Sequence, residues 1–330
     1  MNILVTGATG FIGKHLVRRL SSEKYSVRCL VREKSNDKEF LQKLNTQLIY
    51  GDLLDNDSLK KAISEIDVVF HLGGVLYSNK KEDYYNCNII GTKNLLEICS
   101  QNNIKKFIYA SSVAVYKPLS HKTLLTENSQ LEPISIYGKS KLEGEKLVLK
   151  FFKEKKLPIV IVRIPIAYGP YQNSMLNKFF FDAIIKKKIY IFGNGNNLRS
   201  LCYIDNLIDG AMLIINNPQV IGKIYNISDA RPYTFNIILK TLSEIIREKI
   251  KIVYLPKILA DFLWSGNKFF EDIFGVYSVK MYPIKTMTLN LGCDISSIRR
   301  ELSFEPSIDL KEGLVRTIEW LKKGGDRCII

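Results

Sequence analysis

The sequence is poor in the residues that build metal centres and disulfide frameworks. It contains only three histidines in 330 residues, and its six cysteines, at positions 29, 87, 99, 202, 293 and 328, lack the paired spacing of metal ligands. Several of these cysteines fall inside apolar segments, so we expect reduced, interior thiols of a cytoplasmic protein. The sequence therefore predicts no metal site.

Long apolar runs are also missing. The best candidate, residues 157–168, is interrupted by Arg163 and falls short of the ~18 uninterrupted residues of a membrane span. The start of the chain lacks the basic flank and small-residue cleavage site of a secretion signal, and residues 3–5 are needed as a first strand. We therefore expect no membrane span and a cytoplasmic location.

Acidic residues are scarce relative to basic ones. The chain has 33 Asp and Glu against 48 Lys and Arg, a formal net charge of +15. Such an excess can reflect a nucleic acid, an anionic membrane surface or a Lys-rich background. Because the basic residues are spread along the chain rather than gathered with aromatic residues, we expect no nucleic-acid partner and favour a basic pocket for an anionic small molecule.

Short β-rich runs alternate with helical patterns through the first half of the chain. The runs are residues 3–5, 26–31, 47–50, 67–72, 106–110 and 158–163, and the clearest helical patterns are 11–20, 84–103 and 137–156. This alternation predicts an α/β fold, a Rossmann-type, doubly wound parallel sheet. After residue 166 the alternation of strands and helices becomes less regular, and we expect a smaller C-terminal substrate-binding lobe there. We assign 1–165 to the dinucleotide-binding domain, with a return segment at about 199–227, and 166–198 with 228–330 to the lobe.

Three glycines lie between the first strand and the first helix. Gly7, Gly10 and Gly13 follow the apolar run and precede the helical pattern at 11–20. In this setting the glycines allow a tight turn, backbone approach to a pyrophosphate and close packing of helix on strand. The position of the glycines predicts a dinucleotide site at the start of that helix.

Tyr137 and Lys141 are one helical turn apart. Both project from one face, and a Lys ammonium there favours the phenolate and lowers the pKa of the Tyr. Tyr77 and Lys81 share the spacing but lie in a polar stretch without helical pattern. Ser111 and Ser112 follow the run 106–110, where the carboxyl end of a parallel strand opens on a ligand crevice. A turn or helix cap is the alternative role for these serines.

Taken in order, these blocks resemble a known family. The residues 7–13, Asp52, 71–74, Asn88 with 91–92, Ser111 with Ser112, and Tyr137 with Lys141 are similar to the extended short-chain dehydrogenase/reductase family, in its nucleotide-sugar epimerase/dehydratase group. The similarity continues through 168–170, 199–205 and 294–320, and so covers nearly the whole chain.

The resemblance implies a role for each matching residue. Ser112, Tyr137 and Lys141 would be catalytic, with Tyr137 as general acid/base, and Ser112, Tyr137 and Arg199 would contact the substrate, Arg199 at its pyrophosphate. Asn88 would also support the active-site helix. The cofactor NAD(P) would be bound by Gly7, Thr9, Gly10, Phe11, Ile12, Gly13, Arg32, Asp52, Leu53, Leu72, Gly73, Gly74, Asn88, Ser111, Tyr137, Lys141 and Ile164. The family also implies a homodimer built on the helices at 84–103 and 137–156.

Several departures from the family pattern qualify this assignment. Val31 and Arg32 stand where NAD-preferring members carry an acid, which slightly favours NADP over NAD. Val113 and Ala114 replace the acidic pair of the dehydratases, so 4,6-dehydration is not expected. A second substrate arginine is missing, and Lys280 or Lys285 could take its place.

The sequence supports two enzymatic hypotheses and opposes a third reading. The first is an NAD(P)-dependent epimerase or oxidoreductase for a secondary alcohol, at C4, of a UDP- or dTDP-linked sugar. The alternative is an NADP-dependent reductase or dehydrogenase of an apolar carbonyl or alcohol, of hydroxysteroid or dihydroflavonol type, for which the aromatic segment 255–282 would be a pocket rather than lobe core. The catalytic set at 112, 137 and 141 argues against a non-catalytic dinucleotide sensor.

Overall fold

A seven-stranded parallel sheet forms the centre of the computed structural model, which describes residues 1–35, 38–172, 183–275 and 277–323. Its strand order is β11-β6-β5-β4-β1-β2-β3, and every neighbouring pair is parallel. The strands are β1 (Asn2–Thr6), β2 (Ser26–Val31), β3 (Gln47–Tyr50), β4 (Val68–His71), β5 (Lys106–Ser112), β6 (Ile159–Ile164) and β11 (Ile224–Asn226). The predicted doubly wound α/β sheet is confirmed.

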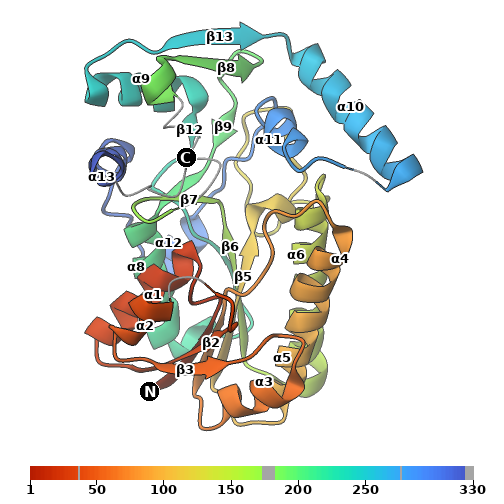
Figure 1. Ribbon diagram of the computed structural model, residues 1–330, viewed down its shortest axis with the longest axis vertical. Helices are drawn as coiled ribbons and strands as arrows, with labels where there is room; N and C mark the ends of the chain where they lie inside the picture. Colours follow the sequence, from red (N-terminus) through yellow and green to blue (C-terminus); the bar gives the residue numbers. More distant parts are fainter. Residues whose placement is uncertain (36–37, 173–182, 276, 324–330) are drawn as a thin grey trace.

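Helices cover both faces of this sheet (Figure 1). One face carries α1 (Phe11–Ser22) and α8 (Ile204–Asn216), and the other carries α3 (Asn56–Ile63), α5 (Thr92–Ser100) and α6 (Ile136–Lys155). The alternation of side chains along β1 explains the two layers, because Ile3 and Val5 pack into the α1 and α8 side while Leu4 packs into the α5 side. Short α2 (Lys38–Gln42) and α4 (Lys81–Tyr84), a π-helix at Tyr85–Gly91 and α12 (Ser296–Leu302) complete this part.

A second group of elements lies beyond the carboxyl ends of the strands, at the top of Figure 1. Parallel β8 and β13 form a two-stranded sheet there, β9 pairs with β12 in antiparallel fashion, and β10 pairs with β7. The bounds are β7 (Ile166–Tyr168), β8 (Lys188–Phe192), β9 (Leu198–Arg199), β10 (Leu201–Tyr203), β12 (Tyr233–Thr234), α9 (Phe235–Ile246), β13 (Lys251–Leu255), α10 (Lys257–Phe274), α11 (Met281–Thr286) and α13 (Leu310–Lys322). We call this group, apart from β7 and β10, the C-terminal lobe.

The expected helix at 84–103 is divided into the π-helix and α5, and the end of β5 also differs from the expected one. This strand runs to Ser112, so Ser111 and Ser112 end the strand instead of following it, in register with Arg163 and Ile164 of β6. Pairing with β6 keeps the two serines extended. The described cysteines, 29, 87, 99, 202 and 293, are all free thiols, whereas Cys328 lies outside the described residues.

An ion pair buried at the carboxyl end of β6 joins several elements. The Arg163 guanidinium meets the Glu145 carboxylate of α6 through Nη2 to Oε2 at 2.8 Å and Nε to Oε1 at 2.9 Å, and the two side chains are 2% and 1% exposed. The Ser111 hydroxyl donates to Glu145 Oε1 at 2.5 Å, and Arg163 Nη1 donates to Tyr116 Oη at 3.0 Å and Glu127 O at 2.8 Å. Glu145 and Arg163 thereby tie α6 to β5 and β6.

Replacing Glu145 with Ala should lower the free energy of unfolding by about 3–5 kcal/mol, because the Arg163 charge would stay buried without its partner. Urea denaturation measures the change. The control is Glu23→Ala, which removes an exposed partner of Arg19 and should cost at most about 1 kcal/mol. A loss below 1 kcal/mol for Glu145→Ala would contradict the structural role of the pair.

Candidate functional site

The glycine turn between β1 and α1 is built on close backbone contacts. Gly7 has φ +71°, and a Cβ there would lie 2.8 Å from the backbone N of Gly73. A Cβ on Gly13 would lie 2.2 Å from Gly7 O, so only glycine permits this approach of helix and strand. Gly10 is the N-cap of α1 and provides no side-chain cap, and no acidic residue follows in the first turn. The start of α1 is therefore suited to an anion.

A cavity of about 580 Å³ opens beside this turn, between the sheet and the C-terminal lobe. It is lined by many of the residues that the sequence singled out: Gly7, Gly10, Phe11, Ile12, Gly13, Leu72, Gly74, Ser111, Ser112, Tyr137, Lys141, Ile164 and Arg199. The remaining predicted residues, Thr9, Arg32, Asp52, Leu53, Gly73 and Asn88, do not line it. The structure thus brings the predicted catalytic residues, the glycine turn and Arg199 to one space.

Tyr137 and Ser112 meet because α6 approaches the end of β5 closely. A Cβ on Gly138 would lie 2.3 Å from Ala114 O, and the Ser135 hydroxyl caps the helix by accepting from Gly138 N at 3.0 Å. Ser112 and Tyr137 both line the cavity, and the interaction with Ser112 lowers the pKa of Tyr137. This arrangement places a proton donor or acceptor next to a second hydroxyl at the wall of the cavity.

Burial nevertheless raises the pKa of Tyr137 above its ordinary value, and the neighbouring Tyr282, Tyr77 and Tyr84 raise it further. This differs from the expectation that Lys141 lowers it. Desolvation of a phenolate in this cavity outweighs the favourable contacts. Burial also lowers the pKa of Lys141 to about 8, and its Nζ lies 4.3 Å from the centre of the Tyr109 ring.

Asn88 occupies the π-helix and links the loop after β4 to α6. Its Nδ2 donates to Val75 O at 3.0 Å and to Ser140 Oγ at 2.8 Å, and its Oδ1 accepts from Val75 N at 2.7 Å. Helical distortions of this kind occur at functional sites. Asn88 is almost completely buried, and these contacts hold the loop after Gly74 against the helix that carries Tyr137. These contacts fit the predicted role of Asn88 in supporting the helix that carries Tyr137.

The carboxyl ends of β2 and β3 carry the residues expected near adenine and ribose. Arg32 is exposed directly after β2, and Asp52 Oδ1 accepts from Leu54 N at 3.0 Å, which shapes the turn after β3. Burial raises the pKa of the Cys87 thiol in the π-helix, Asp52 raises it further and Arg32 lowers it. Because β2 and β3 are parallel neighbours, Arg32 and Asp52 lie at the same edge of the sheet.

Arg199 is a buried cation in the cavity wall. It belongs to β9, is 5% exposed, and donates through Nη2 to Thr286 O. Its Nε has no hydrogen-bond partner among the residues that the structure describes, and burial lowers its pKa to about 10. A buried guanidinium with an unused donor favours an anionic ligand. The expected substitutes for a second arginine are not in this wall: Lys285 pairs with Asp261 at 2.6 Å, and Lys280 does not line the cavity.

Sequence reasoning missed a group of aromatic residues around Tyr137. Tyr77, dismissed with Lys81 by its local sequence, lines the cavity with Tyr84, Tyr277 and Tyr282. Tyr84 Oη accepts from Ser78 N at 2.8 Å, and Tyr277 Oη donates to Ser78 O at 2.6 Å. The spacing of these residues carries no periodic signal, because they come from segments 190 residues apart.

The aromatic segment 255–282 is divided between two environments. Trp264, Tyr277 and Tyr282 line the cavity, but most of the apolar side chains of α10 are exposed, and Ala260 is the buried residue of this helix. Neither alternative, lobe core or apolar pocket, describes the segment as a whole. The physical reason is that α10 contacts the rest of the lobe along one face only.

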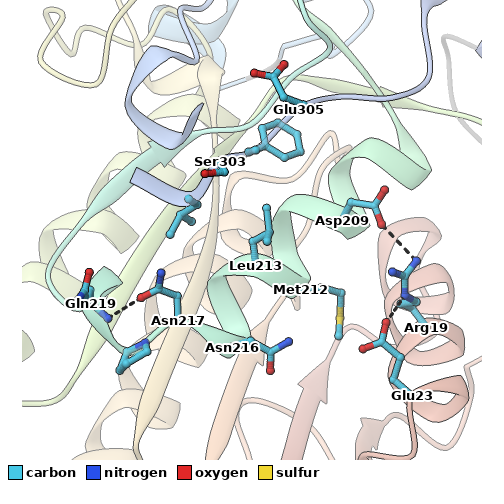
Figure 2. Close-up of a pocket in the computed structure, with 13 residues that line it drawn as sticks. Arg19, Glu23, Asp209, Met212, Leu213, Asn216, Asn217, Gln219, Ser303 and Glu305 are labelled. Carbon is cyan, nitrogen blue, oxygen red and sulfur yellow. Dashed lines mark hydrogen bonds and ion pairs between the residues drawn. The ribbon is translucent and has the colours of Figure 1, made fainter. Parts of the chain in front are cut away.

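A second hollow, of about 800 Å³ and wide open, lies beside α1 and α8 (Figure 2). Arg19 pairs there with Glu23 at 2.5 Å and with Asp209 at 3.2 Å. None of the predicted site residues lines it. Its charges are already paired, so the smaller cavity is the better candidate.

Among the described residues, no group of three or more His, Cys, Asp and Glu could hold a metal ion. Within the described ranges, no helix is long and apolar enough to cross a membrane.

Comparisons with known proteins agree with the geometry. Residues 3–228 match the NAD dependent epimerase/dehydratase family. An uncharacterised UDP-glucose epimerase of Bacillus subtilis is 29% identical over 97% of this chain and 98% of its own. An Escherichia coli O157:H7 4-epimerase of N-acetyl-glucosaminyl-diphospho-undecaprenol is 25% identical over 97% and 95%. The crystal structure of UDP-glucuronic acid 4-epimerase from Bacillus cereus, with UDP-glucuronic acid and NAD, is 28% identical, covers 98% of this chain and 99% of its own, and superposes with a TM-score of 0.80.

The lowered pKa of Lys141 predicts a pH-dependent stability difference. Below pH 8 the folded protein holds a desolvated charge, whereas above the unfolded value of 10.5 Lys141 is neutral in both states and the cost disappears. We expect Lys141→Met to be more stable than wild type at pH 7, with the advantage shrinking by pH 10. Urea denaturation of the nucleotide-free protein at both pH values measures this. An advantage independent of pH would contradict it.

Proposed function

Because the chain belongs to the NAD-dependent epimerase/dehydratase family, we propose that it interconverts the configuration, or the oxidation state, of a secondary alcohol at C4 of a UDP- or dTDP-linked sugar. The observation that carries this proposal is that one cavity contains Ser112, Tyr137 and Lys141 together with the buried guanidinium of Arg199. The first three suit an alcohol, and Arg199 suits a pyrophosphate. A nucleotide sugar has both groups.

Each of these four residues has a task in the proposed reaction. Tyr137 removes the proton of the C4 hydroxyl and later returns one, while Ser112 holds the same oxygen by a hydrogen bond. Lys141, buried close to Tyr109, supplies positive charge at the base of α6. NAD(P), bound along the glycine turn, would accept and return the hydride. Arg199 anchors the diphosphate, so the sugar can turn while its nucleotide stays in place.

The cavity and its edge also support a proposal for the type of reaction and one for the cofactor. Ser112 is followed by the apolar Val113 and Ala114, which supply no acid for the removal of water, and this supports epimerase or reductase chemistry over 4,6-dehydration. Arg32 is exposed at the end of β2, where a guanidinium suits a 2′-phosphate and supports NADP. Mass spectrometry of the retained nucleotide distinguishes the cofactors. Tightly held NAD that is not consumed indicates an epimerase, and exchangeable NADPH consumed with a keto-sugar indicates a reductase.

A second candidate substrate is a hexose linked through diphosphate to a polyprenol. The observation that favours it is the apolar, exposed side of α10, whose opposite side lines the cavity. The E. coli relative is named for such a lipid-linked substrate. Parallel assays with UDP-sugars and with a polyprenyl-diphospho-N-acetylhexosamine in detergent separate the two candidates, because Arg199 would serve the diphosphate of either.

Tyr137→Phe should lower turnover of the best sugar substrate by about 10²–10⁴-fold, since the general acid/base is removed. Sugar product is measured by chromatography. Tyr85→Phe is the control, because Tyr85 is 56% exposed and does not line the cavity. Unchanged turnover in Tyr137→Phe would refute the enzyme proposal.

Arg199→Met should weaken binding of free UDP or dTDP by at least about tenfold, because a charged donor to the diphosphate is lost. Isothermal titration measures the affinity, and thermal melting checks the fold. Arg231→Met is the matched control, since Arg231 is exposed outside the cavity. Equal affinity in wild type and Arg199→Met would favour the apolar carbonyl or alcohol substrate instead.

A further inference from the structure

The helix α10 has an apolar side that no described part of the chain covers. We call this side the outer face of α10; its residues are 40% to 76% exposed and are Ile258, Leu259, Phe262, Phe269, Phe270, Ile273 and Phe274. In Figure 1 the helix projects from the end of β13 at the edge of the C-terminal lobe. A contiguous surface made of seven exposed apolar side chains marks an interaction site.

The residues of the outer face follow helical spacing. Ile258, Phe262, Phe269 and Ile273 are separated by four, seven and four residues, which places them in one stripe along the helix. Gly266 lies in the same stripe, and a Cβ there would meet nothing within 4 Å. The stripe is thus a continuous open surface.

The inner face of α10 contains both apolar and polar side chains. Ala260 is buried, and Trp264, Asn267 and Glu271 line the cavity. A surface helix ordinarily turns its apolar side to the core and its polar side to water. In α10 Trp264 and two polar side chains face the cavity while phenylalanines face outward, so the packing of the described residues does not explain the outer face.

Aromatic contacts make the outer face a preformed cluster. The Phe270 ring lies 5.9 Å from that of Phe269 and 5.8 Å from that of Phe274, measured between centroids. Rings that are already arranged lose little conformational freedom when a ligand covers them.

The charges near the outer face indicate the nature of its partner. Two of the three carboxylates of α10 are in ion pairs, Asp261 with Lys285 at 2.6 Å and Glu271 with Lys81 at 3.3 Å. Lys257, the first residue of α10, is exposed, and the chain as a whole carries a net charge of +15. An apolar face on a cationic protein complements an anionic bilayer, which offers acyl chains and negative headgroups together.

The β8 and β13 sheet, which leads into α10, carries side chains of the kind expected at such a boundary. Lys188 and Lys251 are paired in register and exposed, and Tyr190 on the same side is 50% exposed. The Lys188 Nζ lies 4.9 Å from the centre of the Tyr190 ring. Tyr and Lys combine an apolar body with a polar end and are suited to the headgroup level.

We propose that the outer face of α10 docks the protein on an anionic membrane surface. The phenylalanines enter the boundary between headgroups and acyl chains, and the lysines of α10, β8 and β13 meet the negative headgroups. Because the inner face of the same helix lines the cavity, the docked protein holds its site next to the bilayer. The proposal concerns binding and is independent of the reaction proposed above.

Co-sedimentation with vesicles tests this proposal. Wild type should pellet with phosphatidylcholine vesicles containing about a third phosphatidylglycerol, and should be released by salt because headgroup attraction is screened. The triple variant Phe262→Ser, Phe269→Ser and Phe270→Ser should bind at least about tenfold more weakly. The matched control replaces exposed apolar residues elsewhere, Leu54→Ser and Leu213→Ser, and should bind like wild type.

A second measurement locates the contact in variants that still bind vesicles. In a background in which the two native tryptophans are replaced, Trp264→Phe and Trp320→Phe, fluorescence of Phe269→Trp should be quenched by vesicles with brominated acyl chains, and that of Leu54→Trp should not. Failure of wild type to pellet, or equal binding by the triple variant, would overturn the proposal. Sedimentation velocity covers the remaining possibility: a dimer that the triple variant abolishes, without vesicle binding, would assign the face to a second copy of the chain and also overturn it.

Discussion

The buried pair between Arg163 and Glu145 sets the geometry on which the candidate site depends. Both charges are removed from water, so each is tolerable only while the other stays in place. Glu145 is on the helix that carries Tyr137 and Lys141, and it also accepts from Ser111, next to Ser112 in β5. The helix that bears Tyr137 and Lys141 is therefore held to the strand that bears Ser112 by bonds that cannot break without leaving a buried charge unpaired.

The same exclusion of water shapes the chemistry of the cavity. Lys141 and Arg199 both line it, and burial lowers the pKa of each, to about 8 and about 10. Two desolvated cations in one cavity make an anionic ligand favourable, since its charge replaces the solvation they have lost. Burial acts in the opposite direction on Tyr137, where it favours the neutral phenol. Burial in this cavity thus favours an anion near the two cations and the neutral form of Tyr137.

The two parts of the molecule meet this cavity in different ways. The sheet contributes residues at the ends of its strands, where the right-handed parallel topology requires a ligand crevice. The C-terminal lobe contributes Arg199 and the inner face of α10, and it reaches back to the sheet through Tyr277 and Ser78. The helix that lines one side of the cavity is also the one with an apolar surface that no described residue covers.

The sequence alone was enough for the parallel sheet, the glycine turn and the Tyr137 to Lys141 spacing, because these depend on short-range periodicity and on glycine's lack of a side chain. It could not place Arg163 opposite Glu145, bring Tyr77 and Tyr282 to Tyr137, or turn the phenylalanines of α10 outward. Those contacts join distant segments, and no local pattern records them. The direction of the Tyr137 pKa was likewise decided by tertiary structure, because desolvation depends on everything that surrounds a group and spacing reports only its neighbours on one helix.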